Sequence, residues 1–206
     1  MKSIALLSLL VVSAFSTLEA GTIEFTISPT VQGLGTNPVL NFTMEGEILS
    51  GSTPISKGAD LVAQSSKGFT NAVDAAVFMT WLIQSGKFDE YRSFMNKFTV
   101  STANPELWKM MNTDDILSQQ QKFIKDTSDL KPLLMINLPD GIQQLLYIVQ
   151  GEKRAVYPLS FKKDGDICKM VLSSMGNGND SHIIYALMEQ VSMNHDKSIE
   201  YHLVKP

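Results

Sequence analysis

Alternation of apolar and polar positions near the start of the chain predicts β-strands. In residues 22–27, Ile23, Phe25 and Ile27 recur at every second position, and side chains at that spacing share one face of a strand. Residues 39–44 form a second candidate strand. The glycine, asparagine and proline residues between the two runs are typical of a loop, so the sequence predicts two strands joined by a loop.

Apolar positions change to the helical period after residue 70. Asn71 is a candidate N-cap, because its side chain can accept a hydrogen bond from the backbone of the first turn. The apolar stripe that follows comprises Ala75, Phe78, Trp81 and Leu82. Gly86 is typical of a helix end. The pattern therefore predicts a helix that begins after Asn71 and ends before Gly86.

Further helices are predicted in the centre of the chain. Residues 89–97 place several apolar side chains, including that of Tyr91, on one helical face. Residues 104–108 begin a short helical turn. Thr113 is a candidate N-cap of a last helix, whose first turn carries two aspartates where the helix dipole favours acids. The side of this helix that we expect to be buried includes the polar Gln120.

After residue 132 the chain returns to a period of two. Turn signals divide this region into four candidate strands, residues 133–137, 144–149, 155–161 and 167–173. Their spacing is close to that of an antiparallel meander. Pro158 indicates an edge or a bulge within the third strand. N-terminal strands, then helices, then a meander predict an α+β fold with helices packed on a curved antiparallel sheet.

One hairpin of the predicted meander resembles a known family. Residues 157–170 read YPLSFKKDGDICKM, a strand, a Lys-Asp-Gly turn and a second strand. This segment is similar to the corresponding hairpin of many secreted NTF2-like (SnoaL-like) domains, although Cys168 stands where the family often has Trp. The resemblance covers about residues 71–174. It implies a cone-shaped fold with a pocket between helices and sheet, and it implies no single activity, because enzymes and non-catalytic domains share the fold.

The first twenty residues have the pattern of a secretory signal peptide. Lys2 precedes the uncharged apolar run 4–15, and Ala20 follows a short polar end. A bilayer span needs about 20 apolar residues, so an uncleaved membrane anchor is the less favoured alternative. We expect a secreted or periplasmic protein whose residues 21–206 form one domain without an integral membrane segment.

Three segments of that expected domain differ in pattern. Residues 21–66 read as N-terminal strands, residues 71–174 as helices and meander, and residues 175–206 as a tail that ends in a closing strand at 199–204. Sequons for N-glycosylation occur at Asn41 and Asn179, and they matter only in a eukaryotic secretory route.

Composition and charge exclude several classes of protein. The chain has 206 residues, a net charge of -4, 44% hydrophobic residues and 18% charged residues, which is a globular composition. Its mild acidity argues against nucleic-acid binding, which needs a basic face. One cysteine, Cys168, excludes an internal disulfide and a cysteine-based zinc site. Because Cys168 lies in a candidate strand, we expect it to be buried.

No motif for catalysis, metal binding or cofactor binding is present in the sequence. Nucleophile elbows, P-loops and zinc-protease motifs do not occur. His182, His195 and His202 lie in the last 25 residues, and their spacing matches no known set of metal ligands. Aspartates in turns and helix caps have structural reasons to be there. We therefore expect no metal and no cofactor.

Aromatic residues are the candidate binding residues. Trp81, Tyr91, Tyr147 and Tyr157 offer apolar rings with a polar tip, which suits the lining of a ligand pocket. Packing in the core is the alternative, and it is the favoured one for Trp81. The pair Met110 and Met111 is either an adaptable contact patch or part of the core.

Three classes of function remain open from the sequence. The leading hypothesis is a non-catalytic accessory domain that binds an unknown small molecule or protein. One alternative is a small pocket enzyme, an isomerase or a hydrolase, which should hold a titratable residue with a perturbed pKa in a closed pocket. The other alternative is an interaction domain whose exposed N-terminal strands pair with a partner chain.

Overall fold

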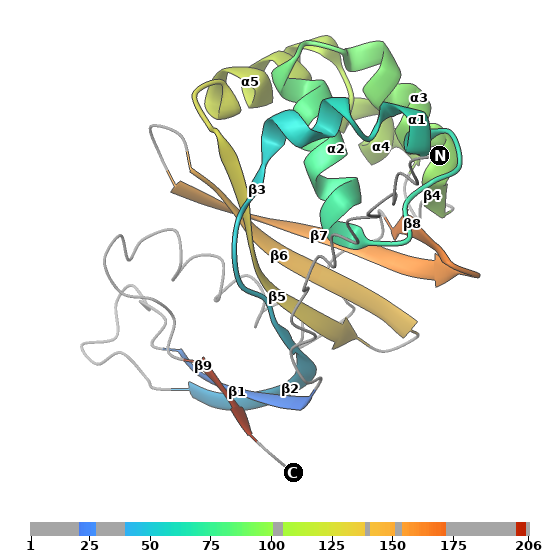
Figure 1. Cartoon of the computed structure of the whole chain (residues 1–206). Coiled ribbons are helices and arrows are strands. Elements are labelled where there is room, and N and C mark those ends of the chain that lie inside the picture. The colour runs from blue at the N-terminus through green and yellow to red at the C-terminus, as the bar shows by residue number, and fades with distance from the viewer. Residues whose placement is uncertain are drawn as a thin grey trace, which may run out of the picture.

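The computed structural model describes residues 21–27, 40–100, 105–138, 141–150, 154–171 and 201–204. The predicted signal peptide, His182, His195 and Asn179 lie outside these ranges. The helices gather on one side of a large sheet (Figure 1), which confirms the α+β class. In the part of the chain that is described, no helix has both the length and the apolar character needed to cross a membrane.

One mixed sheet contains all nine described strands. Along the sheet the order is β4-β8-β7-β6-β5-β2-β1-β9, and β3 also pairs with β5. Their bounds are β1 Gly21–Ile27, β2 Leu40–Ile48, β3 Thr53–Pro54, β4 Thr99–Val100, β5 Asp129–Leu138, β6 Ile142–Gln150, β7 Arg154–Asp164, β8 Ile167–Val171 and β9 Tyr201–Val204. The pair β4 and β8 is parallel, and the other pairs are antiparallel.

Strands β5 to β8 form the predicted meander. Each pairs with the next along the chain, and the strands extend a few residues beyond the predicted bounds in most cases. Pro158 pairs with Leu146 of β6, whereas β8 pairs only with residues 161–164 of β7. Pro158 therefore lies where the described pairing of β7 is one-sided, as a residue without an amide proton requires.

The N-terminal strands continue the same sheet. Gly46 of β2 pairs with Ile136 of β5, and a Cβ atom on Gly46 would collide with the carbonyl oxygen of Met135. On its other side β2 pairs with β1, whose residues 22–25 also pair with β9. Both backbone sides of this part of β1 are therefore occupied, contrary to the expectation of exposed N-terminal strands.

Short helices interrupt the segment that the sequence assigned to strands. The helices are the 3₁₀ helix η1 Ile55–Ala59 and the α-helices α1 Val62–Ser65, α2 Ala72–Gln84, α3 Phe88–Phe98, α4 Pro105–Met111 and α5 Asp114–Ile124. The strand assignment of residues 21–66 is thus wrong for η1 and α1. Elements of four or five residues are too short to display a helical period, and tertiary contact explains η1, because Gly58 packs directly against Trp81.

Helix α2 is the central helix of the helical layer. The side chain of Asn71 accepts a hydrogen bond of 2.7 Å from the backbone amide of Val73, which confirms the predicted N-cap. Burial extends well beyond the predicted stripe, to Ala72, Ala75, Ala76, Val77, Phe78, Met79, Thr80, Leu82 and Ile83. A helix buried on nearly all sides packs against both the sheet and its neighbouring helices.

Helix α5 begins where the sequence predicts, but Thr113 does not cap it. The Thr113 side chain makes no capping hydrogen bond, and its hydroxyl lies 3.3 Å from the carbonyl oxygen of Met110 instead. The two predicted aspartates do occupy the first turn of the helix. Only the capping role predicted for Thr113 is therefore wrong.

An aromatic core joins the helical layer to the sheet. Rings of Phe69, Phe78 and Phe94 lie with their centroids 5.1–5.6 Å apart. Cys168 of β8 is buried, as predicted, and its thiol lies 3.4 Å from the carbonyl oxygen of Thr70. These residues belong to one hydrophobic core shared by α2, α3 and the strands β6 to β8.

Candidate functional site

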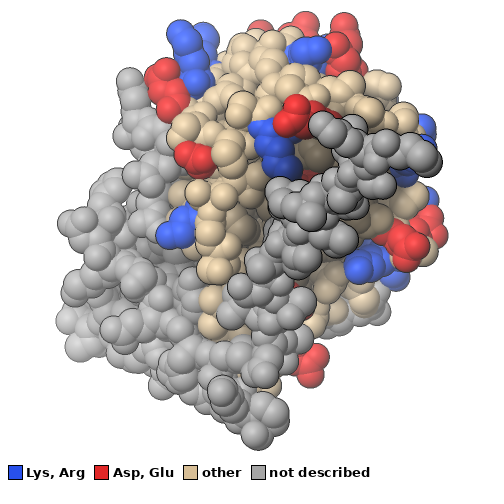
Figure 2. Space-filling model, viewed as in Figure 1, with Lys and Arg blue, Asp and Glu red and all other residues tan. Residues whose placement is uncertain are grey.

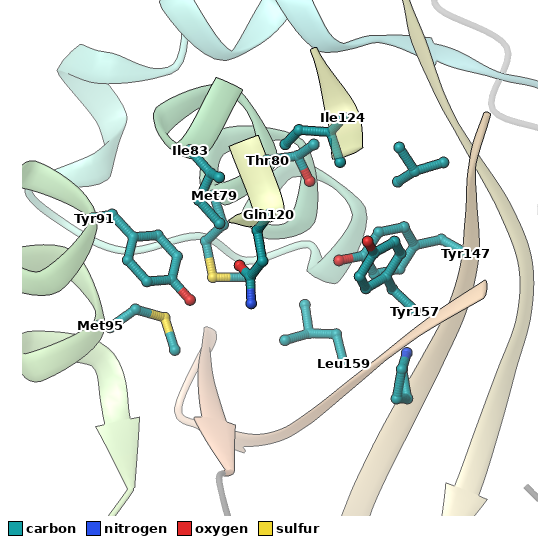
Figure 3. A pocket seen from close by; sticks show the side chains of 12 residues that line it. Met79, Thr80, Ile83, Tyr91, Met95, Gln120, Ile124, Tyr147, Tyr157 and Leu159 are labelled. Carbon is teal, nitrogen blue, oxygen red and sulfur yellow. The ribbon is translucent and has the colours of Figure 1, made fainter. Parts of the chain in front are cut away.

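A cavity of about 190 Å³ lies between the helical layer and the meander. We call it the tyrosine cavity (Figure 3). Its walls come from α2, α3 and α5 on the helical side and from β6 and β7 on the sheet side. The residues that line it are Met79, Thr80, Ile83, Tyr91, Met95, Gln120, Ile124, Tyr147, Val149, Tyr157, Pro158 and Leu159.

Two stacked tyrosines form the aromatic wall on the sheet side. Tyr147 of β6 and Tyr157 of β7 are directly opposite each other in the antiparallel register, so both side chains project from the same face. Their ring centroids are 5.8 Å apart, and the ring planes are inclined by 21°. Phe123 contacts Tyr157 edge-on with centroids 6.4 Å apart, which supports the pair from the side of α5.

The opposite wall consists of helical side chains that are spaced one helical turn apart. Tyr91 and Met95 are four residues apart on α3, and Gln120 and Ile124 are four residues apart on α5, so each pair shares a face. In Figure 3 the Tyr91 hydroxyl points into the cavity from the side opposite to the stacked pair, and Gln120 lies between them.

Burial controls the acidity of the phenols in the cavity. It raises the pKa of Tyr91 to about 12 and also raises the pKa of Tyr157. The pKa of Tyr147 is raised by burial first and by the neighbouring phenols of Tyr157 and Tyr91 second, whereas a hydrogen bond with Thr80 lowers it. The three hydroxyl groups therefore stay protonated near neutral pH, and each can donate a hydrogen bond.

Neutral side chains make up the whole described lining. Among these twelve residues there is no Asp, Glu, His, Lys, Arg or Cys, and the described residues contain no cluster suited to a metal ion. Acidic and basic side chains are instead interspersed over the outer face seen in Figure 2. The cavity thus combines apolar and aromatic surface with a few neutral hydrogen-bonding groups, which is the composition of a small-molecule binding site.

Three of the four predicted binding residues meet in this cavity. Tyr91, Tyr147 and Tyr157 all line it. Trp81 lies instead in a separate surface groove between α1, α2 and α3, where Lys87 is 5.2 Å from the centre of its ring. Trp81 and Thr80 are consecutive on α2, so their side chains point about 100° apart around the helix. Because of this difference in direction, Trp81 contributes to the groove and Thr80 to the cavity.

The sequence prediction missed several residues of the lining. Thr80 and Gln120 are polar residues on helix faces that are otherwise apolar. A polar residue in such a position can be recognised in the sequence as a candidate binding residue. The apolar members, such as Met79 and Leu159, carry no such signal, because the same side chains fill any core. Met110 and Met111 are exposed, at 60% and 49%, so they belong to the surface and not to the core.

The remaining described sequence features belong to other strands than those that line the cavity. Asn41 is in β2 and His202 is in β9. Comparison of the chain with protein-family models, with curated proteins and with solved structures finds no match.

Proposed function

We propose that this chain is an exported, non-catalytic domain that binds a small ligand in the tyrosine cavity. One observation carries the proposal: Tyr91, Tyr147 and Tyr157, from three separate elements, line one partly open cavity between helices and sheet. Filling that space with protein side chains would improve the packing of the domain, since empty volume costs stability. A retained cavity with polar groups directed into it is what a binding protein needs.

The arrangement supports an NTF2-like fold as part of the same proposal. In that family, helices cover one face of an antiparallel sheet and a pocket lies between them. Here α2, α3 and α5 line the cavity together with β6 and β7 of the meander. The N-terminal strands β1 and β2 then extend the sheet beyond the region of resemblance.

Binding is favoured over catalysis by the chemistry of the lining. General acid–base catalysis near neutral pH needs a group whose pKa lies close to that pH. The titratable groups in the described lining are the three phenols, and burial moves the pKa of each further from neutrality. They are suited to donate hydrogen bonds to a ligand and poorly suited to exchange protons with it.

Blocking the cavity tests the proposal. Leu159 projects into the cavity (Figure 3), so Leu159→Phe should fill part of the space and abolish ligand binding while the domain remains folded. A library of small neutral and charged fragments is screened by ligand-observed NMR against the wild type and the variant. We expect fragments that bind the wild type and lose binding in the variant.

A matched substitution separates blocking from general disturbance. Leu49 is also partly buried against the core but does not line the cavity, so Leu49→Phe should leave fragment binding unchanged. Thermal unfolding verifies that both variants are folded. A screen in which every fragment binds the wild type and Leu159→Phe equally would contradict the proposal.

Export is the second part of the proposal. Strand β1 begins at Gly21, directly after the predicted cleavage position Ala20, so cleavage there leaves every described strand complete. We expect N-terminal sequencing of protein recovered from the medium or periplasm to begin near Gly21. A charge in the apolar run, Leu10→Arg, should block export. Exported protein that retains Met1 would contradict cleavage.

A further inference from the structure

We propose that the ligand of the tyrosine cavity is a neutral, planar molecule of a single ring that presents a carbonyl oxygen to the hydroxyl of Tyr91. This inference rests on the proposed binding function and adds the chemical class of the ligand. Four properties of the cavity define that class: its volume, the shape of its walls, its lack of charge and the hydrogen bonds that its polar groups have left to make.

Volume limits the ligand to one ring. The cavity measures about 190 Å³, and an apolar cavity of roughly 150 Å³ in another protein accommodates benzene. The present space therefore fits a six-membered ring with one small substituent. A larger ligand would extend out of the cavity toward solvent.

The walls favour a planar ring. The rings of Tyr147 and Tyr157 stack on each other with planes inclined by 21°, and a third aromatic ring can continue the stack in an offset arrangement or pack against the ring edges. Met79 and Met95 lie on the opposite side, together with Tyr91 (Figure 3). Thioether side chains contact the faces and edges of rings favourably and adapt to their outline.

The lack of charge in the lining favours a neutral ligand. A carboxylate or an ammonium group that enters the cavity loses its hydration, and the described lining offers no charge of opposite sign to compensate. Transfer of an unpaired ion into such surroundings is strongly unfavourable, whereas a neutral polar group needs only a hydrogen bond. Neutral compounds should therefore bind in preference to ions of the same shape.

The free hydrogen-bonding groups indicate where the ligand oxygen lies. The hydroxyl of Thr80 already donates to the carbonyl oxygen of Ala76 at 2.7 Å, so its proton is not available to a ligand. The hydroxyl of Tyr91 points into the cavity (Figure 3). A carbonyl oxygen of the ligand can accept a hydrogen bond from it.

Three probes of matched size test this assignment by calorimetric titration. Benzamide is neutral and planar and has a carbonyl oxygen, benzoate has the same shape with a negative charge, and toluene has no acceptor. We expect benzamide to bind with a Kd of about 0.1–1 mM, in the range for a ligand of this size. Benzoate should bind at least about tenfold more weakly, because its charge is unpaired in the cavity. Toluene should also bind more weakly than benzamide.

Hydroxyl deletions then locate the carbonyl oxygen. Tyr91→Phe should weaken benzamide binding about three- to tenfold, the effect of one lost hydrogen bond, and Tyr157→Phe should weaken it less. Toluene binding should change little in either variant, because no hydrogen bond is involved. Thr113→Val is the control for loss of a hydroxyl, since Thr113 is exposed and does not belong to the cavity lining; it should bind benzamide like the wild type.

The outcomes separate the ligand class from the binding function. Binding that is lost in Leu159→Phe but is confined to charged or multi-ring fragments would overturn the ligand class alone. Equal binding of benzamide and benzoate, or unchanged benzamide affinity in Tyr91→Phe, would also overturn it. Absence of any fragment sensitive to Leu159→Phe would overturn the binding function itself.

Discussion

Burial determines the acidity of the phenols of Tyr91, Tyr147 and Tyr157, which no local sequence pattern indicates. Each phenol has a pKa above its usual value, because the ionised form loses hydration in the cavity and finds no cation in the described lining. The hydroxyls therefore donate hydrogen bonds over the whole physiological pH range. The same shift links folding stability to pH in the alkaline range.

The pKa shift of Tyr91 predicts a loss of stability at high pH. Its pKa is about 12 in the folded protein against 10.0 when unperturbed, so the folded state binds the proton more tightly. This contribution is complete below pH 10 and is lost as the pH rises to about 12, and it amounts to about 2–3 kcal/mol. Between pH 9 and pH 11 the free energy of unfolding, measured by urea denaturation, should fall less in Tyr91→Phe than in the wild type. Identical pH dependence in both proteins would contradict the prediction.

Helices α2 and α5 show what sequence patterns can establish about single elements. Both begin directly after a residue type that commonly caps helices. Asn71 has an extended backbone and accepts the capping hydrogen bond from Val73. Thr113 has a similar backbone, yet its hydroxyl points to the preceding helix α4. Residue type thus predicts the helix start, whereas the orientation of the side chain depends on the neighbouring element.

Alanine substitutions should reveal this difference in stability. Asn71→Ala removes a capping hydrogen bond and should lower the free energy of unfolding by about 1 kcal/mol. Thr113→Ala removes only an exposed hydrogen bond to Met110 and should cost less than about 0.5 kcal/mol. Urea denaturation of the two variants measures both values. An equal loss in the two variants would mean that Thr113 also stabilises its helix start.

At the scale of the whole molecule, one glycine joins the N-terminal strands to the meander. Strand β2 pairs with β5 over only three residue pairs, and Gly46 is in the first of them. The backbone of Met135 passes so close to Gly46 that no side chain fits between them. Strands β1 and β9 reach the rest of the sheet through β2, so this contact determines whether the sheet extends beyond the meander.

Substitution of Gly46 should therefore disturb more than its own position. Gly46→Ala forces β2 away from β5 and should lower the free energy of unfolding by more than about 2 kcal/mol. Gly51 is a suitable control, because its φ is +91° but nothing lies within 4 Å of an added Cβ. Gly51→Ala should cost only the backbone strain, about 1 kcal/mol. Chemical denaturation of both variants tests the difference, and equal losses would exclude a special role for Gly46.

The sequence by itself determined the α+β class, the meander, the start of α2 and the burial of Cys168. Each of these depends on a local pattern, since the spacing of apolar side chains and the residue types of caps and turns act within one element. The α+β class and the meander could therefore be predicted from the sequence. The helices η1 and α1 and the strands β3 and β4 are too short to show a pattern, and the pairing of β2 with β5 joins segments far apart in the chain.

Only the tertiary structure decided which aromatic residues share one cavity. Trp81 and Tyr91 belong to the same candidate set in the sequence, yet only Tyr91 lines the cavity with Tyr147 and Tyr157. That distinction depends on how α2 is rotated against the sheet and how β6 aligns with β7. The rotation of α2 and the alignment of the strands depend on packing and pairing between residues far apart in the chain. The pattern within a single segment therefore cannot predict them.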